Sequence, residues 1–271
     1  MSGERSEQAT GPTPIPRHGA ASEASAIINT KIYIHELVDI IGHNRARYMQ
    51  HMTANWGPIG RAERNMLCFA VWGTVGSTGR WPEVVNLWEL DGWEGLAANF
   101  EHELTPGSMQ DESLAKWWAV AAELRRGGHD RIVVPEPWSP TSEELTSAGG
   151  AHAVAYAHEM VTLPVGGARA FLDDLRQVGV PAVESFGLRA IGAYRVAMIN
   201  DSEAIVIWSI PDWETWIAYE RAWDDGSLRA WRARLVELGA DVRRMLLCDA
   251  PLSPLRTGRQ PQVEDRIEWD A

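Results

Sequence analysis

The side chains best suited to proton transfer in this sequence are two histidine–glutamate pairs. His35-Glu36 and His158-Glu159 each lie in an apolar stretch of high β propensity, 123 residues apart. A histidine and a carboxylate can donate and accept protons near neutral pH, so these four residues are the candidate catalytic groups. Because successive strand residues point to opposite faces, an adjacent pair cannot work as a dyad, and one member is expected on each face.

The same pairs also admit a structural interpretation, and they do not predict a metal site. Since the pair occurs twice, Glu36 and Glu159 could instead be a device of the fold that accepts hydrogen bonds from loop backbone. Neither pair, nor His102-Glu103, is followed by a second histidine four residues on, so the zinc-protease pattern is absent. No metal ligand set is predicted.

The two pairs belong to an internal repeat. The stretch VVNLWELDGW from Val84 to Trp93 is echoed as AIVIWSIPDW from Ala204 to Trp213, a separation of 120 residues. Near the end of each copy, Leu124 returns as Leu238, a separation of 114 residues. The separation falls along the chain because the copies differ in their loops, as expected of two diverged copies of one fold.

Residues that differ between the copies are candidates for a site that arose after duplication. Asn86 stands where the second copy has Val206, on a strand face shared with Trp88. An asparagine on an apolar face must find partners or cost a few kcal/mol, so Asn86 is a candidate for orienting a ligand. A hydrogen bond to a neighbouring loop is the alternative. The other substitutions of this kind are Tyr48 for Phe171, His51 for Asp174 and Glu89 for Ser209.

The chain is rich in tryptophan, with 14 residues against five tyrosines and four phenylalanines. Tryptophans at helical spacing are expected to pack in the core. Trp88 and Trp208 on strands, with Trp72 near a loop, are expected to line a cavity for a flat or hydrophobic ligand. The predicted ligand-binding set is therefore Asn86, Trp88, Trp208, Tyr48, His51 and Trp72.

The composition argues against several classes of partner. The formal net charge is −12 and no basic run is present, which disfavours nucleic-acid or anionic-membrane binding. Cys68 and Cys248 lie in apolar runs and are expected to be buried, reduced thiols. No signal-like segment and no apolar run near the roughly 18 residues of a membrane span is found, so a cytoplasmic protein is expected.

Changes in composition predict the domain boundaries. Residues 1–28 are rich in Pro, Gly, Ser and Glu and are expected to be a disordered tail. The remaining expected segments are a first repeat over 29–134, a linker over 135–150, a second repeat over 151–255 and a poorly packed C-terminal tail over 256–271.

Each repeat is predicted to contain, in order, a strand, a helix, two strands, two helices and a strand. This is the βαββαβ arrangement of the ferredoxin-like fold with one extra helix, an α+β fold whose helices cover one face of an antiparallel sheet. The bare face is best buried against the second copy, so the two sheets are expected to pair into an α/β barrel. Two chains could instead exchange partners in a homodimer. In the first repeat the last helix is expected to end at Gly127-Gly128, before a short strand over 132–134.

This pattern resembles the NIPSNAP family within the dimeric α/β-barrel superfamily. The resemblance covers about residues 30–256 and is carried by Tyr33, Glu36, Leu37 and the run Val84–Trp88, and more weakly by Tyr156, Glu159, Met160, Ile205, Ile207 and Trp208. The sequence departs from the family in the histidine before the glutamate and in lacking Lys-Pro-Gly after the first strand. The resemblance implies the fold, while functions in the superfamily range over haem-binding proteins, cofactor-free oxygenases, dehydratases, cyclases and proteins without assigned activity.

Three functions are consistent with these residues. The first is an enzyme that binds a small hydrophobic or aromatic metabolite and performs acid–base chemistry without a redox cofactor, as a dehydration, isomerisation, cyclisation or cofactor-free oxidation. There, His35 or His158 would move the proton, Glu36 or Glu159 would act as base or set the tautomer, and Asn86 would hold a polar group. The second is a non-catalytic ligand-binding or scaffolding protein of the NIPSNAP type. The third is a haem-dependent lyase comparable to the aldoxime dehydratases, with its axial ligand among His43, His51, His102, His129 and His152.

Overall fold

The computed structural model describes residues 28–104 and 111–266. Almost all of the predicted disordered tail, residues 1–27, lies outside the described residues. The first repeat comprises β1 (Ile32–Ile40), α1 (Arg45–Gln50), the π-helix η1 (His51–Trp56), α2 (Gly57–Arg64), β2 (Leu67–Thr74), β3 (Glu83–Leu90), α3 (Gly92–Leu104), α4 (Glu112–Leu124) and β4 (Arg125–Pro135).

The second repeat has the same order of elements. It comprises β5 (Ala155–Thr162), α6 (Ala168–Asp174), the π-helix η2 (Leu175–Gly179), α7 (Val180–Glu184), β6 (Arg189–Ala197), β7 (Glu203–Ile210), α8 (Trp213–Asp225), α9 (Arg229–Glu237) and β8 (Asp241–Asp249). Three short helices lie outside the repeats: α5 (Ser142–Ser147), α10 (Pro254–Thr257) and the 3-10 helix η3 (Val263–Asp265).

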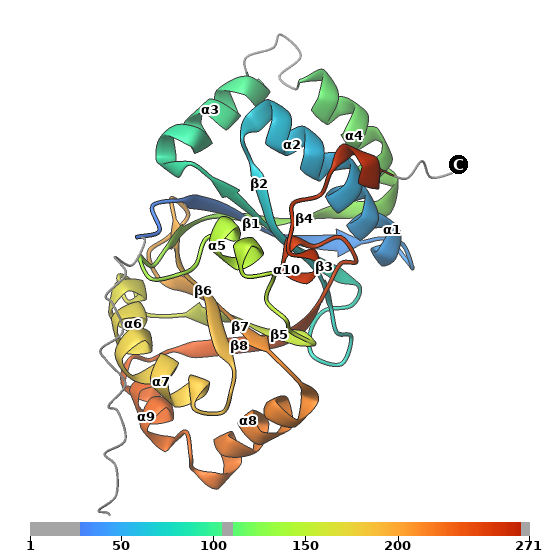
Figure 1. Ribbon diagram of the computed structural model, residues 1–271. Helices are drawn as coiled ribbons and strands as arrows, with labels where there is room; N and C mark the ends of the chain where they lie inside the picture. Colours follow the sequence, from blue (N-terminus) through green and yellow to red (C-terminus); the bar gives the residue numbers. More distant parts are fainter. Residues whose placement is uncertain (1–27, 105–110, 267–271) are drawn as a thin grey trace, which may run out of the picture.

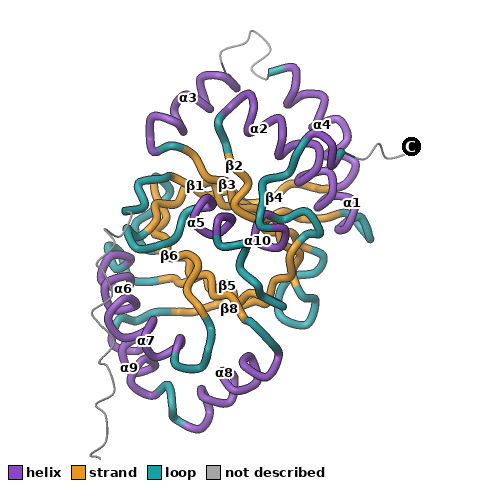
Figure 2. The backbone as a smooth tube through the Cα atoms, viewed as in Figure 1, coloured by secondary structure: helices purple, strands orange, loops and turns teal. Residues whose placement is uncertain are grey.

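The eight strands form one closed antiparallel barrel, in the order β1-β3-β2-β8-β5-β7-β6-β4. Each repeat contributes four adjacent strands, and the two sheets join where β2 pairs with β8 and β4 pairs with β6. The helices of each repeat lie outside the barrel, in two groups on opposite sides of it (Figures 1 and 2). The predicted α+β fold is confirmed, and the barrel closes within a single chain.

Alternation along β1 determines which side chains enter the barrel. Tyr33 faces inward, where it packs against Phe69 and Tyr194 of other strands. Ile32 and Val38, which lie one residue before and five residues after Tyr33 and therefore on the other face, pack in the core formed with the helices of the first repeat. His35 therefore points into the barrel and Glu36 points towards the helices.

His35 and His158 meet in the centre of the barrel. Their Nε2 atoms are 2.9 Å apart and their rings are stacked, with centroids 5.0 Å apart. Both side chains are fully buried. Burial lowers the pKa of His158 to about 4, and burial together with the neighbouring His158 holds the pKa of His35 well below its usual range. Both rings are therefore neutral near pH 7, and one Nε2 donates a hydrogen bond to the other across the two sheets.

The end of α4 differs from the prediction. The helix ends at Leu124 and β4 begins at once, so Gly127-Gly128 lies within an 11-residue strand instead of stopping a helix. Gly128 pairs with Val38, and a Cβ there would lie 2.3 Å from the Leu37 carbonyl oxygen. Gly128 is required because β1 and β4 approach closely there, whereas Gly127 has open space around it and a φ of +141°, and the local sequence pattern revealed neither requirement.

The segments predicted as linker and C-terminal tail are packed against the first repeat. The Gln260 side chain donates to the Cys68 carbonyl oxygen over 2.7 Å and to the Ser142 hydroxyl over 2.9 Å, and it accepts from the Cys68 backbone N–H. Within the expected tail Gln260 makes these contacts, while residues 267–271 lie outside the described residues. Within the described chain, no helix is long and apolar enough to cross a membrane.

The histidine pair should make the barrel sensitive to acid. Unfolded histidines titrate near 6.5, so below that pH the unfolded chain binds protons that the folded chain does not, and stability falls as the pH drops from about 6.5 towards 4. Replacing both residues by leucine, which the apolar barrel interior accepts, should remove this component. Urea unfolding at pH 7 and pH 5 should show a loss about 2–4 kcal/mol larger for the wild type than for the double variant. An equal loss in both proteins would contradict the buried, neutral pair.

Candidate active site

A pocket of about 380 Å³ lies between the outer face of the first sheet and the helices of the first repeat. Its apolar lining includes Ile34, Met52, Trp56, Trp88, Trp117 and Trp118. Its charged lining consists of Glu36, Arg64, Glu103, Arg125, Asp130 and Arg131. Residues 197–199, at the end of β6 of the second repeat and just after it, complete one wall. An apolar, aromatic cavity with a few charged groups is typical of a small-molecule site.

Glu36 is the most perturbed acid of this pocket. Its Oε2 accepts hydrogen bonds from Asn86 Nδ2 over 2.7 Å and from Trp88 Nε1 over 3.1 Å. Both donors belong to β3: Asn86 lies directly opposite Glu36, and Trp88 lies two residues further along the same face of the strand. Burial, and then the charge of Asp130, raise the pKa of Glu36 to about 7, although the two hydrogen bonds oppose the shift. A carboxyl with this pKa can take up and release protons near neutral pH.

Asp130 is the cross-strand neighbour of Glu36 on β4. Burial also raises the pKa of Asp130, although the charges of Arg125, His129 and Arg131 oppose the shift. Like charges placed directly opposite one another destabilise a sheet, so this pair needs a reason other than stability. Two interacting carboxyls in a cavity are a frequent arrangement at catalytic sites, because each makes ionisation of the other less favourable.

The second repeat has the opposite arrangement at the equivalent position. Glu159 pairs across the strands with Arg244, whose Nε lies 2.8 Å from Glu159 Oε1. The Arg244 guanidinium stacks over Tyr219 and Trp223, and the Tyr219 hydroxyl donates to Glu159 over 3.4 Å. Glu159 is thus neutralised and enclosed, whereas Glu36 faces a second carboxyl in a cavity.

The structure brings four of the residues predicted from sequence into one cluster. Asn86 Nδ2 also donates to the Tyr48 hydroxyl over 3.3 Å, so Glu36, Asn86, Trp88 and Tyr48 are linked by hydrogen bonds. The Asn86 Oδ1 atom is buried and has no hydrogen-bond partner among the described residues. Asn86 therefore orients Glu36, and one of its polar atoms remains free.

The other predicted site residues lie elsewhere. His35 and His158 are in the barrel interior, and Trp72 is there too, with its ring 5.5 Å from that of Tyr156. Trp208 is fully buried in the core of the second repeat. His51 stacks on Trp117, at a ring distance of 5.2 Å, and its Nε2 bonds to the Trp117 carbonyl oxygen, so it supports a pocket wall without lining the pocket.

Asp130 and Arg125 were missed by sequence reasoning. Both belong to β4, which was predicted as a strand of only three residues further along. Extending the separation of 114 residues along the repeat would have aligned Asp130 with Arg244 and Arg125 with Gly239. An aspartate in place of an arginine, and an arginine in place of a glycine, are the differences in the sequence that distinguish the pocket of the first repeat from the equivalent position of the second.

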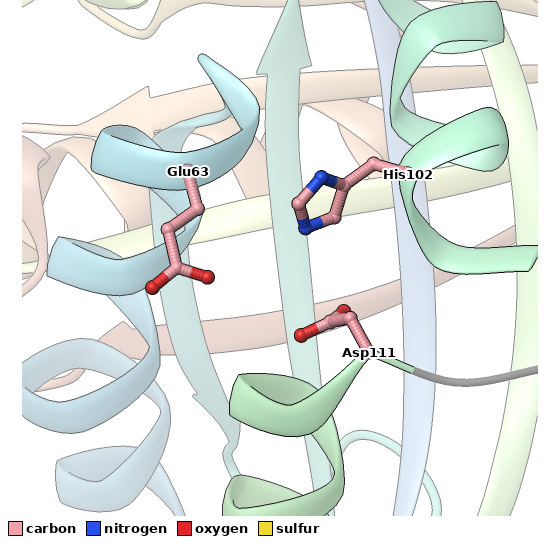
Figure 3. Close-up of side chains that lie close together, drawn as sticks. All are labelled: Glu63, His102 and Asp111. Atoms are coloured by element: carbon pink, nitrogen blue, oxygen red, sulfur yellow. The ribbon is translucent and has the colours of Figure 1, made fainter. Parts of the chain in front are cut away.

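Beside the pocket, Glu63, His102 and Asp111 place one ligand atom each within 4.8 Å of the others (Figure 3). Asp111 caps α4 by accepting from the Leu114 N–H over 2.9 Å, and its other oxygen pairs with the buried Arg64 guanidinium. A cation bound here would lie beside that guanidinium, so the cluster is better suited to holding α4 in place than to binding a metal.

In the part of the chain that the structure describes, the pocket lacks the two side chains most suited to a proximal haem ligand, histidine and cysteine. None of the described residues that line it is a histidine or a cysteine. His51, the candidate axial ligand nearest to its wall, has both ring nitrogens engaged, Nε2 with Trp117 and Nδ1 with Asn55 over 2.9 Å. The described lining therefore offers no histidine or cysteine to a haem iron in this cavity.

The fold is that of the dimeric α+β-barrel proteins, here formed by one chain. A candidate monooxygenase from Fusobacterium nucleatum has a TM-score of 0.53 at 8% identity, covering 86% of this chain and 98% of its own. A candidate monooxygenase from Lactobacillus acidophilus has a TM-score of 0.52 at 8% identity, with coverages of 82% and 97%. An anthrone oxidase-like protein has a TM-score of 0.52 at 14% identity, with coverages of 81% and 92%. No protein-family model and no curated protein sequence matches the chain.

Asp130→Arg should give Glu36 the counter-ion that Arg244 gives Glu159. Glu36 has a pKa of about 7 in the folded chain and an ordinary glutamate pKa of 4.5 in the unfolded chain. Its ionisation therefore destabilises the fold fully above pH 7 and does not affect stability below pH 4.5. The free energy of unfolding of the variant should therefore rise by roughly 1–2 kcal/mol at pH 8 and change little at pH 5. Chemical denaturation at the two pH values measures this, with Asp224→Arg on the exposed face of α8 as the control. A gain that is the same at both pH values would contradict the perturbed Glu36.

Proposed function

We propose that this chain is an enzyme that binds a small hydrophobic or aromatic metabolite in the pocket of the first repeat and performs acid–base chemistry without a redox cofactor. The observation that carries the proposal is the pairing of Glu36 with Asp130 at the position where the second repeat has a neutralising arginine. A purely structural carboxyl would be expected to keep its counter-ion in both repeats. A glutamate with a pKa of about 7, facing a ligand-sized cavity, is suited to general-base catalysis.

In this mechanism Glu36 is the catalytic base. Asn86 and Trp88 hold its Oε2 from β3 and leave its Oε1 for the substrate. Burial and Asp130 keep the pKa high enough for Glu36 to abstract a proton from a weak carbon or hydroxyl acid. Abstraction of such a proton gives an electron-rich anion, from which isomerisation, loss of water, cyclisation and direct reaction with dioxygen can all proceed. Cofactor-free oxidation is the reaction among these that agrees with the names of the structurally similar monooxygenases and anthrone oxidase-like protein.

The proposed role of the histidines changes accordingly. His35 and His158 are fully buried in the barrel, so in this proposal they stabilise the pairing of the sheets and do not transfer protons to substrate. Membership of the NIPSNAP family remains part of the proposal, because the fold is of the kind that the resemblance implies and the motif residues Glu36 and Trp88 lie on the same face of the paired strands β1 and β3. A non-catalytic binding protein of that type would use the same pocket without needing a glutamate of raised pKa.

The test compares the glutamates of the two repeats. The wild type, Glu36→Gln and Glu159→Gln are incubated with a small-molecule extract of the host, and consumed and formed masses are followed by mass spectrometry. Turnover should be lost by at least about a hundredfold in Glu36→Gln, the usual contribution of a general base. It should persist in folded Glu159→Gln, even though that variant loses an ion pair and melts lower.

The pH dependence of turnover gives a second readout. Because Glu36 must be ionised to accept a proton, the rate should rise with pH through a midpoint near 7. Turnover that is unchanged in Glu36→Gln would contradict the proposal. Tight binding of a metabolite that is never converted would instead support the non-catalytic alternative.

A further inference from the structure

Arg125 is a pocket residue that makes no salt bridge within the described chain, although its charge opposes the raised pKa values of Asp130 and Glu36. It is the first residue of β4, directly after α4, and its guanidinium carbon lies 3.8 Å from the ring centre of Trp118 and 5.3 Å from that of Trp117. Its Nη1 donates a long hydrogen bond, 3.4 Å, to the Tyr48 hydroxyl. Its Nε is buried and unsatisfied within the described chain, where no carboxylate oxygen lies within 4.0 Å of the guanidinium.

The other two arginines of the pocket already have acidic partners. Arg64 pairs with Asp111 and Glu103, and Arg131 pairs with Glu203 over 3.0 Å. A partly buried guanidinium without a directly contacting anion is expensive, because it gives up water and gains no charged hydrogen bond in return. The C-terminal end of α4 favours a positive charge at Arg125, but this field occupies none of its N–H donors.

Arg125 is also specific to the first repeat. The equivalent residue of the second repeat is Gly239, and the arginine of that repeat, Arg244, stands at the position of Asp130. The second repeat therefore uses its arginine to neutralise its glutamate. In the first repeat the positive charge lies at the start of β4, stacked on two indoles, and the carboxyls are left unpaired.

We infer that Arg125 binds a carboxylate of the ligand, so that the substrates of this pocket are aromatic or hydrophobic carboxylic acids. Stacking on Trp118 fixes the plane of the guanidinium, and a fixed guanidinium fork matches the two oxygens of a carboxylate. The adjacent indoles offer flat surfaces for the apolar part of such an acid. The inference rests on the proposed function only in requiring that the pocket binds ligand.

The distribution of charge in the pocket agrees with the binding of one anionic group of the ligand beside Arg125. The acids that face the pocket are Glu36, Asp130 and Glu103, and Glu103 is already paired with Arg64. Glu36 and Asp130 face one another across β1 and β4, whereas Arg125 pairs with Ile40 near the far end of β1. An acid held by Arg125 can thus extend its apolar part along the tryptophans towards Glu36.

The test uses a matched pair of probes, 1-naphthoate and its neutral analogue 1-naphthamide, titrated into the full chain by calorimetry at pH 7. The wild type should bind the acid at least about tenfold more tightly than the amide, the contribution expected of one charged, paired hydrogen-bonding group. Arg125→Gln should remove this preference, and Arg125→Lys should reduce it, because lysine keeps the charge without the fork. The control is Arg126→Gln, since Arg126 is the next residue of the strand and is exposed.

The outcomes separate this inference from the proposed function. Equal binding of the two probes, binding of neither at millimolar concentration, or a preference that survives in folded Arg125→Gln would overturn the role of Arg125. Arg125→Lys keeps the test valid if Arg125→Gln is too unstable to titrate. The pH dependence assigned to Glu36 is measured without any of these probes, so its presence or absence judges the proposed function alone.

Discussion

The charge opposite Glu36 decides what the pocket of the first repeat can do. In the second repeat the cross-strand neighbour of the equivalent glutamate is Arg244, and the result is a closed ion pair. In the first repeat that neighbour is Asp130, so burial and a like charge act on Glu36 together and raise its pKa to about 7. One difference in charge between two copies of the same strand thus separates a structural element from a candidate catalytic one.

The barrel keeps this pair in place. Closure of eight strands within one chain fixes β1 between β3 and β4, which supply Asn86 and Trp88 on one side of Glu36 and Asp130 on the other. The interior of the barrel is filled with aromatic and aliphatic side chains around the His35–His158 hydrogen bond. Strand alternation therefore separates the two members of each His-Glu pair. The histidine points into the barrel and bonds to the other sheet, while the glutamate points towards the helices.

Much of the fold could be predicted from the sequence, because the repeat and the strand alternation are local patterns. The strand around Trp88, the opposite faces of His35 and Glu36 and the grouping of Asn86 with Trp88 are predicted in this way and observed. The extent of β4 could not be predicted, because Gly128 reflects a close approach of β1, a contact between strands that are distant in sequence. Asp130 and Arg125 were missed for the same reason, and Trp72 and Trp208 could not be placed because burial depends on which sheet faces which helix.

The most direct measurement is the titration of the Glu36 side chain itself, by carbon-13 NMR of glutamate-labelled protein, with Glu36→Gln to assign the resonance. A midpoint near 7 is predicted, because burial and Asp130 both oppose ionisation. A second titration in Asp130→Asn should give a lower midpoint, since the like charge is then removed. A wild-type midpoint near the 4.5 of an ordinary glutamate would contradict the central claim, because Glu36 would then be a weak, permanently ionised base.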